Sequence, residues 1–356
     1  MRPRLALLAV AVALAGCGVH GGEPAGARVP KTTTGILPPG VPTEGNRPAA
    51  DALPPAAEPH NAPPPSGSVP GRIVHVGNSP EGIVVDGATR TVAVATRGPD
   101  QLVVLDADSA VITARIPLPG SARHLQLAAP GGPVLVPVEN ANALVFVDLR
   151  QKAASAPIVT GTSPHDAAAA SNGIVFVSNE LGGTVTALRD NHFDKVFTDS
   201  VQPAGVAGYG TAVGMLDARQ NTLTVYDAEK LTVLGSTLAG AGPTHLVADR
   251  HGRMIAADTR GDAIRVFDPL PAPRQAASIS QPGGPYGLAY DPQRDRLWVA
   301  SSGLNRVIGY DMAQPTPRPV RRIPTVQDPY SLAVDPTTGR LFIAGVTGGQ
   351  VQIVDT

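Results

Sequence analysis

A repeat of about 42 residues runs from residue 71 to residue 356 of this chain. Each copy begins with a Pro that is followed, three positions later, by an apolar run, and Ala122 replaces the Pro in the second copy. The copies start at positions 80, 122, 164, 203, 243, 285 and 329, so they are separated by 42, 42, 39, 40, 42 and 44 residues. A period this regular requires a series of similar units, each packed against the next.

Every repeat contains short apolar runs with the alternation of β-strands. The third of these runs ends in Asp in six copies, whereas Arg189 takes that place in the third copy. Four strands in about 42 residues make one blade of a β-propeller. We therefore predict an all-β fold, a seven-bladed β-propeller over residues 71–356. The six Asp residues are Asp106, Asp148, Asp227, Asp268, Asp311 and Asp355.

The two ends of the repeat region predict how the ring closes. The last copy stops at Thr356, directly after its third strand, so it lacks an outer strand. Residues 71–77 precede the first copy and have the pattern of an outer strand. We predict that they pair with the C-terminal strands and complete the seventh blade, because this removes two open sheet edges.

Several of these strands resemble the YVTN-repeat (YncE-like) family of seven-bladed propellers. The resemblance covers residues 71–356 and implies the fold rather than one activity. The Gly-His and Trp-Asp pairs of WD40 propellers do not recur, and Trp298 is the only Trp. The matching segments are Phe176-Val177-Ser178-Asn179 with Gly182-Gly183-Thr184-Val185, Trp298-Val299-Ala300-Ser301 with Asn305-Arg306-Val307-Ile308, and Asp335-Pro336-Thr337-Thr338-Gly339-Arg340.

The N-terminus resembles a bacterial lipoprotein signal peptide. Arg2 and Arg4 precede an apolar run over residues 5–15, which is too short for a stable membrane-spanning helix. The run ends in Leu14-Ala15-Gly16-Cys17, which is similar to a lipobox. The resemblance implies that residues 1–16 are removed and that Cys17 receives palmitate-like acyl chains. It places the protein on the extracytoplasmic face of a bacterial membrane, held by its N-terminal lipid.

Residues 18–70 are predicted to form a disordered tether. They hold 13 Pro in 53 positions and no aromatic residue. Because Pro lacks an amide proton and favours extended conformations, this composition is typical of a linker. With the lipidated Cys17, the predicted tether spans residues 17–70.

Composition excludes several classes of function. The chain has one Cys, so it cannot form a disulfide framework or a Cys-rich metal site. Its 28 basic and 29 acidic residues give a net charge of -1, which does not support a nucleic-acid partner.

The residues that follow each first Pro should form a ring at one mouth of the central channel. The turns between the second and third strands of each blade open on the same face. Polar groups from several blades converge there, so this is the expected ligand site. The candidate residues are Glu81, His124, Glu139, His165, Asp166, Glu180, His245, Tyr286 and Tyr330, with Arg97 and Arg123 beside them.

Two chemical alternatives remain open at this ring. His124, His165, Asp166 and His245 have the ligand types of a zinc site, as in periplasmic metallochaperone propellers, although their positions in the repeat differ. Glu81, Glu139, Glu180 and His165 could supply a general base, as in lactone-hydrolysing propellers. No Gly-x-Ser-x-Gly motif is present, and the only Cys lies in the lipobox.

These observations favour a non-catalytic binding or interaction module of the bacterial cell envelope. Its expected partners are the membrane and an envelope protein, glycan or small ligand, without nucleic acid. No cofactor is assigned, and zinc stays an alternative.

Overall fold

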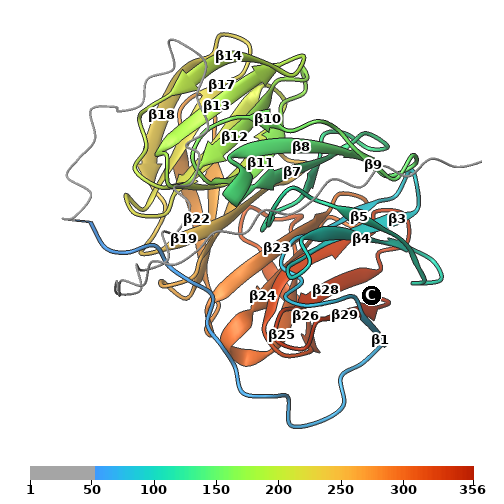
Figure 1. Cartoon of the computed structure of the whole chain (residues 1–356). Helices are drawn as coiled ribbons and strands as arrows, with labels where there is room; N and C mark the ends of the chain where they lie inside the picture. Colours follow the sequence, from blue (N-terminus) through green and yellow to red (C-terminus); the bar gives the residue numbers. More distant parts are fainter. Residues whose placement is uncertain (1–52) are drawn as a thin grey trace, which may run out of the picture. The chain divides into compact units, whose positions relative to one another are not determined.

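The computed structural model describes residues 53–356, which form seven antiparallel sheets arranged as a β-propeller (Figure 1). The innermost strand of each sheet contacts that of the next, in the order β2, β6, β11, β15, β19, β23 and β27, and β27 contacts β2. The predicted fold class and number of blades are therefore confirmed. Among the described residues, no helix has the length and apolar character needed to cross a bilayer. The signal peptide, Cys17 and residues 18–52 of the predicted tether lie outside these residues.

The first three blades follow one another along the chain. Blade 1 contains β2 (Ile83–Asp86), β3 (Thr91–Thr96), β4 (Gln101–Asp106) and β5 (Ile112–Pro117). Blade 2 contains β6 (Gln126–Leu127), β7 (Val134–Val138), β8 (Ala143–Asp148), β9 (Ala153–Ala154) and β10 (Ile158–Val159), and β9 and β10 both pair with β8. Blade 3 contains β11 (Pro164–Ala169), β12 (Val175–Asn179), β13 (Thr184–Arg189) and β14 (His192–Phe197).

The remaining blades repeat this order. Blade 4 contains β15 (Pro203–Tyr209), β16 (Ala212–Asp217), β17 (Thr222–Asp227) and β18 (Thr232–Leu238). Blade 5 contains β19 (Pro243–Ala248), β20 (Met254–Asp258), β21 (Ala263–Asp268) and β22 (Arg274–Ser280). Blade 6 contains β23 (Pro285–Asp291), β24 (Arg296–Ser301), β25 (Arg306–Asp311) and β26 (Arg318–Pro324). Blade 7 contains β27 (Pro329–Val334), β28 (Leu341–Gly345), β29 (Gln350–Val354) and β1 (Arg72–His75).

Strand β1 closes the ring as the sequence predicts. It pairs antiparallel with β29, from Arg72 opposite Ile353 to His75 opposite Gln350. Val76 follows β1 and is fully buried, and its amide donates to the carbonyl of Gly349 at 3.0 Å. The N-terminal strand therefore supplies both backbone pairing and apolar contact to the C-terminal blade.

The hydrophobic core lies between neighbouring blades. Ile255 and Val266 of blade 5 pack with Leu297 of blade 6. The single Trp, Trp298, is 2 % exposed and packs with Leu341 of the next blade. Because both faces of each sheet are covered by the neighbouring sheets, the strands are apolar on both sides rather than strictly alternating.

The recurrent Asp at the end of the third strand has a local role. Asp106, Asp148 and Asp227 each accept backbone amide hydrogen bonds from residues two and three positions later, at distances between 2.7 and 3.2 Å. Such side-chain bonds stabilise a tight turn. The marker that reveals the repeat in the sequence therefore organises the turn to the outer strand in blades 1, 2 and 4.

Residues 53–65, which we call the strap, contact the propeller through hydrogen bonds instead of standing free of it. The backbone amide of His60 donates to Ser302 Oγ at 2.9 Å, and that of Ala62 donates to Asp328 Oδ1 at 2.8 Å. In Figure 1 the chain from residue 53 to β1 runs across the face of the ring. This differs from the prediction of a disordered tether up to residue 70, because three prolines of this segment, Pro54, Pro55 and Pro63, accept hydrogen bonds from side chains of blades 4, 5 and 6.

Candidate functional site

The start of each inner strand lies beside the end of the second strand in the same blade. Pro164 is paired with Asn179, Pro203 with Asp217 and Pro243 with Asp258. A register shift follows directly after each of these prolines. Bulges of this kind turn side chains away from the regular alternation, so they direct the residues after the Pro into the channel mouth.

Two arginines and two glutamates form an ion-pair network between blades 1 and 2. Arg97 Nη2 lies 3.0 Å from Glu81 and 3.2 Å from Glu139. Arg123 Nε lies 3.4 Å from Glu81 and 3.2 Å from Glu139. Each carboxylate therefore contacts both guanidinium groups, and the four charges compensate one another.

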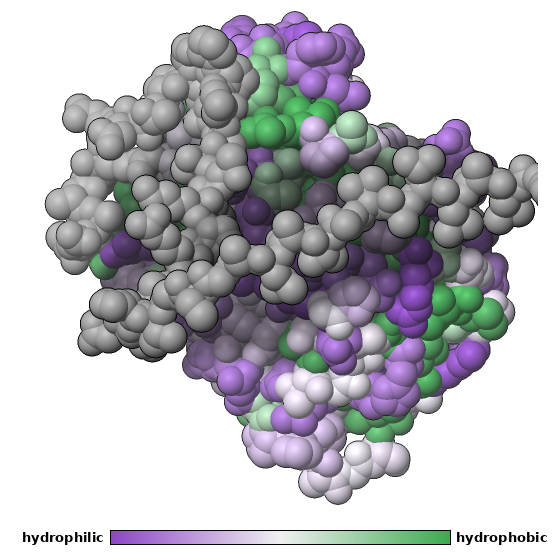
Figure 2. All heavy atoms as spheres, viewed as in Figure 1, coloured by the Kyte–Doolittle hydropathy of each residue, from purple (hydrophilic) through white to green (hydrophobic). Residues whose placement is uncertain are grey.

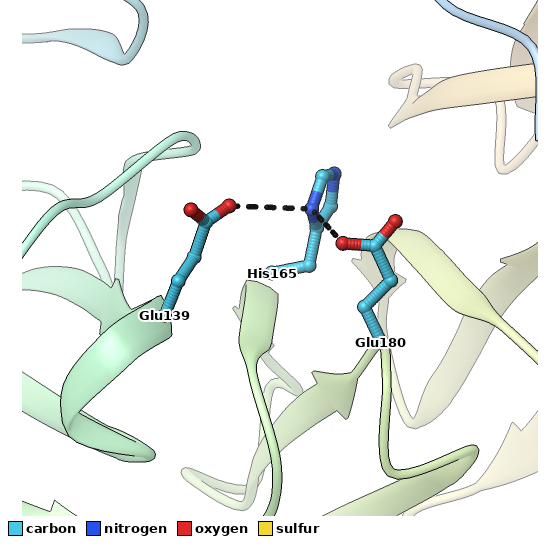
Figure 3. A group of neighbouring side chains, drawn as sticks. All are labelled: Glu139, His165 and Glu180. Atoms are coloured by element: carbon cyan, nitrogen blue, oxygen red, sulfur yellow. Dashed lines mark ion pairs between the residues drawn. The ribbon is translucent and has the colours of Figure 1, made fainter. Parts of the chain in front are cut away.

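His165 on β11 extends this network into blade 3. Figure 3 shows its ring between Glu139, in the 3-10 turn η2 (Glu139–Ala141), and Glu180. The Nδ1 atom lies 3.0 Å from Glu180 Oε2 and 3.8 Å from Glu139 Oε1. Gln202 of blade 4 donates to Glu180 at 2.8 Å. Burial raises the pKa of Glu180, but the hydrogen bond and charge of His165 outweigh it and lower that pKa to about 2.

Three imidazoles gather inside the mouth. The ring of His124 lies 4.5 Å from that of His165 and 4.4 Å from that of His245. The ring of Tyr286 packs edge-on against that of His245, with 4.2 Å between the ring centroids. The ring of Tyr330 packs edge-on against that of Tyr286, with 5.7 Å between their centroids. Burial, followed by the charge of His165, lowers the pKa of His245 to about 3, and burial also lowers the pKa of His124. Both rings are therefore neutral at pH 7.

Asp166 does not join the charged network. Its carboxylate accepts from Gln126 Nε2 at 3.0 and 3.1 Å, from the amide of Val206 at 2.9 Å and from that of Ala167 at 2.8 Å. Burial raises its pKa to about 6, although these hydrogen bonds oppose the shift. Asp166 thus links blades 2, 3 and 4 around the channel.

The predicted metal-ligand set is only partly brought together. In the described part of the chain, one group of His and carboxylate ligand atoms lies close enough to hold an ion, within 4.8 Å of one another. This group contains His165 of the predicted set, with Glu139 and Glu180 in place of His124, Asp166 and His245. Its donors fit zinc, but Glu139 is shared with Arg97 and Arg123.

Among the described residues, one cavity and one much smaller space lie along the channel. A cavity of about 510 Å³ lies toward the face opposite the mouth, and His124, Asp166, Tyr209 and Tyr290 are among its lining residues. At the mouth, the space between the strap and His165 is only about 20 Å³, enough for one water molecule. Strap residues 56–58 therefore lie beside Arg123, His165, Glu180 and Tyr286 at the mouth.

The sequence predicts one ring of candidate residues at the mouth, whereas in the structure His124, Asp166 and His245 also line the cavity toward the opposite face. Several partners of these residues were not predicted. Gln126 has no sequence signal, because a single Gln in an inner strand does not mark a binding site. The docking of the strap was not predicted, because a proline-rich composition is typical of a linker. A signal for Gln202 was present in the sequence, since it precedes a blade's first Pro.

Comparisons with known proteins support the fold. No family model and no curated protein matches the chain. Among solved structures, the WD40 repeats of RRP9 align with a TM-score of 0.71 at 12% identity, over 81% of this chain and 99% of that one. A hydrazine synthase of Kuenenia stuttgartiensis aligns with a TM-score of 0.68 at 14% identity, over 78% and 96%.

An enzyme is also among the similar structures. The virginiamycin B lyase of Staphylococcus aureus aligns with a TM-score of 0.65 at 12% identity, over 81% of this chain and 99% of the lyase. Since identities at this level establish the architecture and not the activity, these likenesses show the β-propeller fold alone.

Proposed function

We propose that this protein is a lipid-anchored, non-catalytic binding module of the bacterial cell envelope, whose binding surface is the channel mouth. The observation that carries the proposal is the convergence of polar side chains from all seven blades on that one face. Figure 2 shows hydrophilic residues gathered toward the middle of this view. The contributing residues, in blade order, are Glu81, Arg123, His165, Gln202, His245, Tyr286 and Tyr330.

The electrostatics favour binding over hydrolysis. A general base works best when its pKa lies near the working pH. Glu180, with a pKa of about 2, is a weak base at neutral pH, and Glu139 is held between two guanidinium groups. Asp166 has a pKa of about 6, but its carboxylate is already held by Gln126 and by the amides of Ala167 and Val206.

Site-specific photo-crosslinking in the native host tests the proposal. A benzophenone side chain at Gln202 lies at the mouth, whereas the same probe at Gln275 on outer strand β22 serves as the matched control. We expect light-dependent adducts of higher mass from position 202 and none from position 275. Adducts from both positions, or from neither, would contradict a binding surface at the mouth.

Zinc binding is the second candidate function, favoured by the grouping of Glu139, His165 and Glu180. Neutral imidazole and carboxylate are suitable ligands, and the ion would bind His165 Nδ1 and the two carboxylates. Calorimetric titration of the full chain with zinc should show one site that Glu180→Gln removes. Glu81→Gln is the control, because Glu81 belongs to the ion-pair network but not to this group. A heat signal unchanged by Glu180→Gln would exclude the site.

A further inference from the structure

The strap is held by side chains of four successive blades. Its carbonyl groups accept most of these hydrogen bonds: residues 53–55 contact blades 4 and 5, and residues 60–63 contact blades 6 and 7. Arg219 donates to Leu53 at 2.8 Å and to Pro54 at 3.1 Å, Arg260 to Pro55 at 2.7 Å, Asn305 to Pro63 at 2.7 Å and Gln327 to Ala62 at 2.8 Å.

This pattern of contacts recognises an extended main chain. A proline-rich segment exposes carbonyl groups that have no amide partner of their own, and it loses little entropy on binding. Arg, Asn and Gln are donors for such carbonyls. The amides of His60 and Ala62 also find acceptors, in Ser302 and Asp328. Donors and acceptors on the propeller therefore match those of the segment.

Glycines make room for the strap at the points of closest approach. A Cβ atom added at Gly303 would lie 2.9 Å from His60 Cβ, and one added at Gly242 would lie 2.7 Å from Ala57 Cβ. At Gly284 it would lie 2.7 Å from His60 Nδ1. Because contacts below 3 Å between such atoms are repulsive, the face accommodates a peptide only while these positions lack side chains.

The strap covers the same residues that form the proposed binding surface. Ala57 and Glu58 line the small space that also contacts Arg123, His165 and Glu180. Ala62 is 6 % exposed, which is low for a residue outside the repeat region. The hydroxyl of Tyr330 donates to Asn61 Oδ1. A ligand at the mouth and the docked strap therefore exclude each other.

We propose that the channel mouth is a receptor surface for an extended, proline-rich peptide, and that the strap occupies it as a ligand in cis. The proposal rests on the proposed function and names the chemical class of the ligand. A peptide from a partner must displace the strap, which is present at an effective concentration of about 1 mM or above. In the isolated chain, the strap consequently occupies the binding surface.

Fluorescence anisotropy with a labelled synthetic peptide of residues 53–66 tests this. In one variant of the full chain, residues 53–65 are replaced by a Gly-Ser linker of equal length. This variant should bind the peptide roughly ten-fold or more tightly than the unmodified chain, because the competing strap is gone. Equal affinity for both chains, or equal affinity for a Gly-Ser peptide of the same length, would overturn the proposal.

Gly303→Ala supplies a second test that leaves the strap sequence unchanged. The added methyl group should loosen the strap and speed hydrogen exchange at the amides of His60 and Ala62 by roughly ten-fold or more. Gly67→Ala is the matched control, since an added Cβ there meets nothing within 4 Å. Unchanged exchange in Gly303→Ala would overturn the strap's docking even if the linker variant does not fold.

The two proposals can fail separately. Light-dependent adducts at position 202 without peptide binding would preserve the binding surface and reject the peptide as its ligand class. Peptide binding without adducts would preserve recognition of the strap and reject an external partner at the mouth.

Discussion

His165 lies between a carboxylate of blade 2 and a carboxylate of blade 3. Its imidazole lies between Glu139 and Glu180, and its ring also contacts His124. The position of His165 could be predicted from the sequence, because it directly follows a blade's first Pro. The partners of His165 could not be predicted from the sequence. The distances between residues 139, 165 and 180 depend on the angle between two blades and on a bulge after Pro164, and no local sequence pattern indicates either.

Glu180→Gln should destabilise the protein in a pH-dependent way. The pKa of Glu180 falls from an ordinary 4.5 to about 2 in the folded chain. Its ionised form therefore stabilises the fold above about pH 4.5, and this contribution is lost as the pH falls toward 2. We expect the free energy of unfolding at pH 7 to fall by about 1–3 kcal/mol, measured by urea denaturation.

Glu229→Gln is the control for this prediction, because Glu229 is exposed in the turn after β17. Its effect should stay within about 0.5 kcal/mol. If Glu180→Gln lowers stability equally at pH 7 and at pH 2.5, the effect does not come from the ionised carboxylate.

The strands follow the repeat closely, and the exceptions have local causes. Blade 2 starts with Ala122 instead of Pro, and its inner strand β6 has only two residues. The strap, in contrast, has no periodic signal, because its contacts are made by Arg219, Arg260 and other residues far along the chain. Elements held by local hydrogen-bond patterns are predictable from sequence, whereas an element held by distant side chains is not.

Val76 directly follows β1 at the closure of the ring, so we expect Val76→Ala to lower the stability of the fold strongly. Val76 is fully buried between blades 1 and 7, so shortening its side chain leaves a cavity at the junction of the chain's two ends. The free energy of unfolding should fall by about 2 kcal/mol. Thermal unfolding followed by circular dichroism measures the change.

Val320→Ala is the matched control for closure. Val320 lies on outer strand β26 and is 50 % exposed, so its truncation should change stability by less than about 0.5 kcal/mol. Equal effects of the two substitutions would mean that residues 71–76 do not hold the ring closed.

Two features of the whole molecule bear on how it would work at a membrane. The strap occupies the mouth, and the same chain carries the predicted lipid site at Cys17. The predicted tether after Cys17 has 53 residues (18–70). When residues 53–65 are docked, only 35 of these residues (18–52) lie between Cys17 and the strap. Release of the strap would therefore both open the binding surface and lengthen the connection to the membrane, so that the two changes are coupled through one segment.

Cys17→Ser tests the anchor itself. Cys17 is the only thiol in the chain, so no other residue can take over S-acylation. In the native host, the variant should lose incorporation of labelled palmitate and move from the membrane fraction to the soluble fraction, because acyl chains supply the membrane affinity. Ser68→Ala, at an exposed position outside the strap, should remain labelled and membrane-bound. Persistent labelling of Cys17→Ser would show that the lipid is attached elsewhere. Loss of label without release from the membrane would show that the propeller is held there by a partner, and the binding surface at the mouth would then be the first place to look for it.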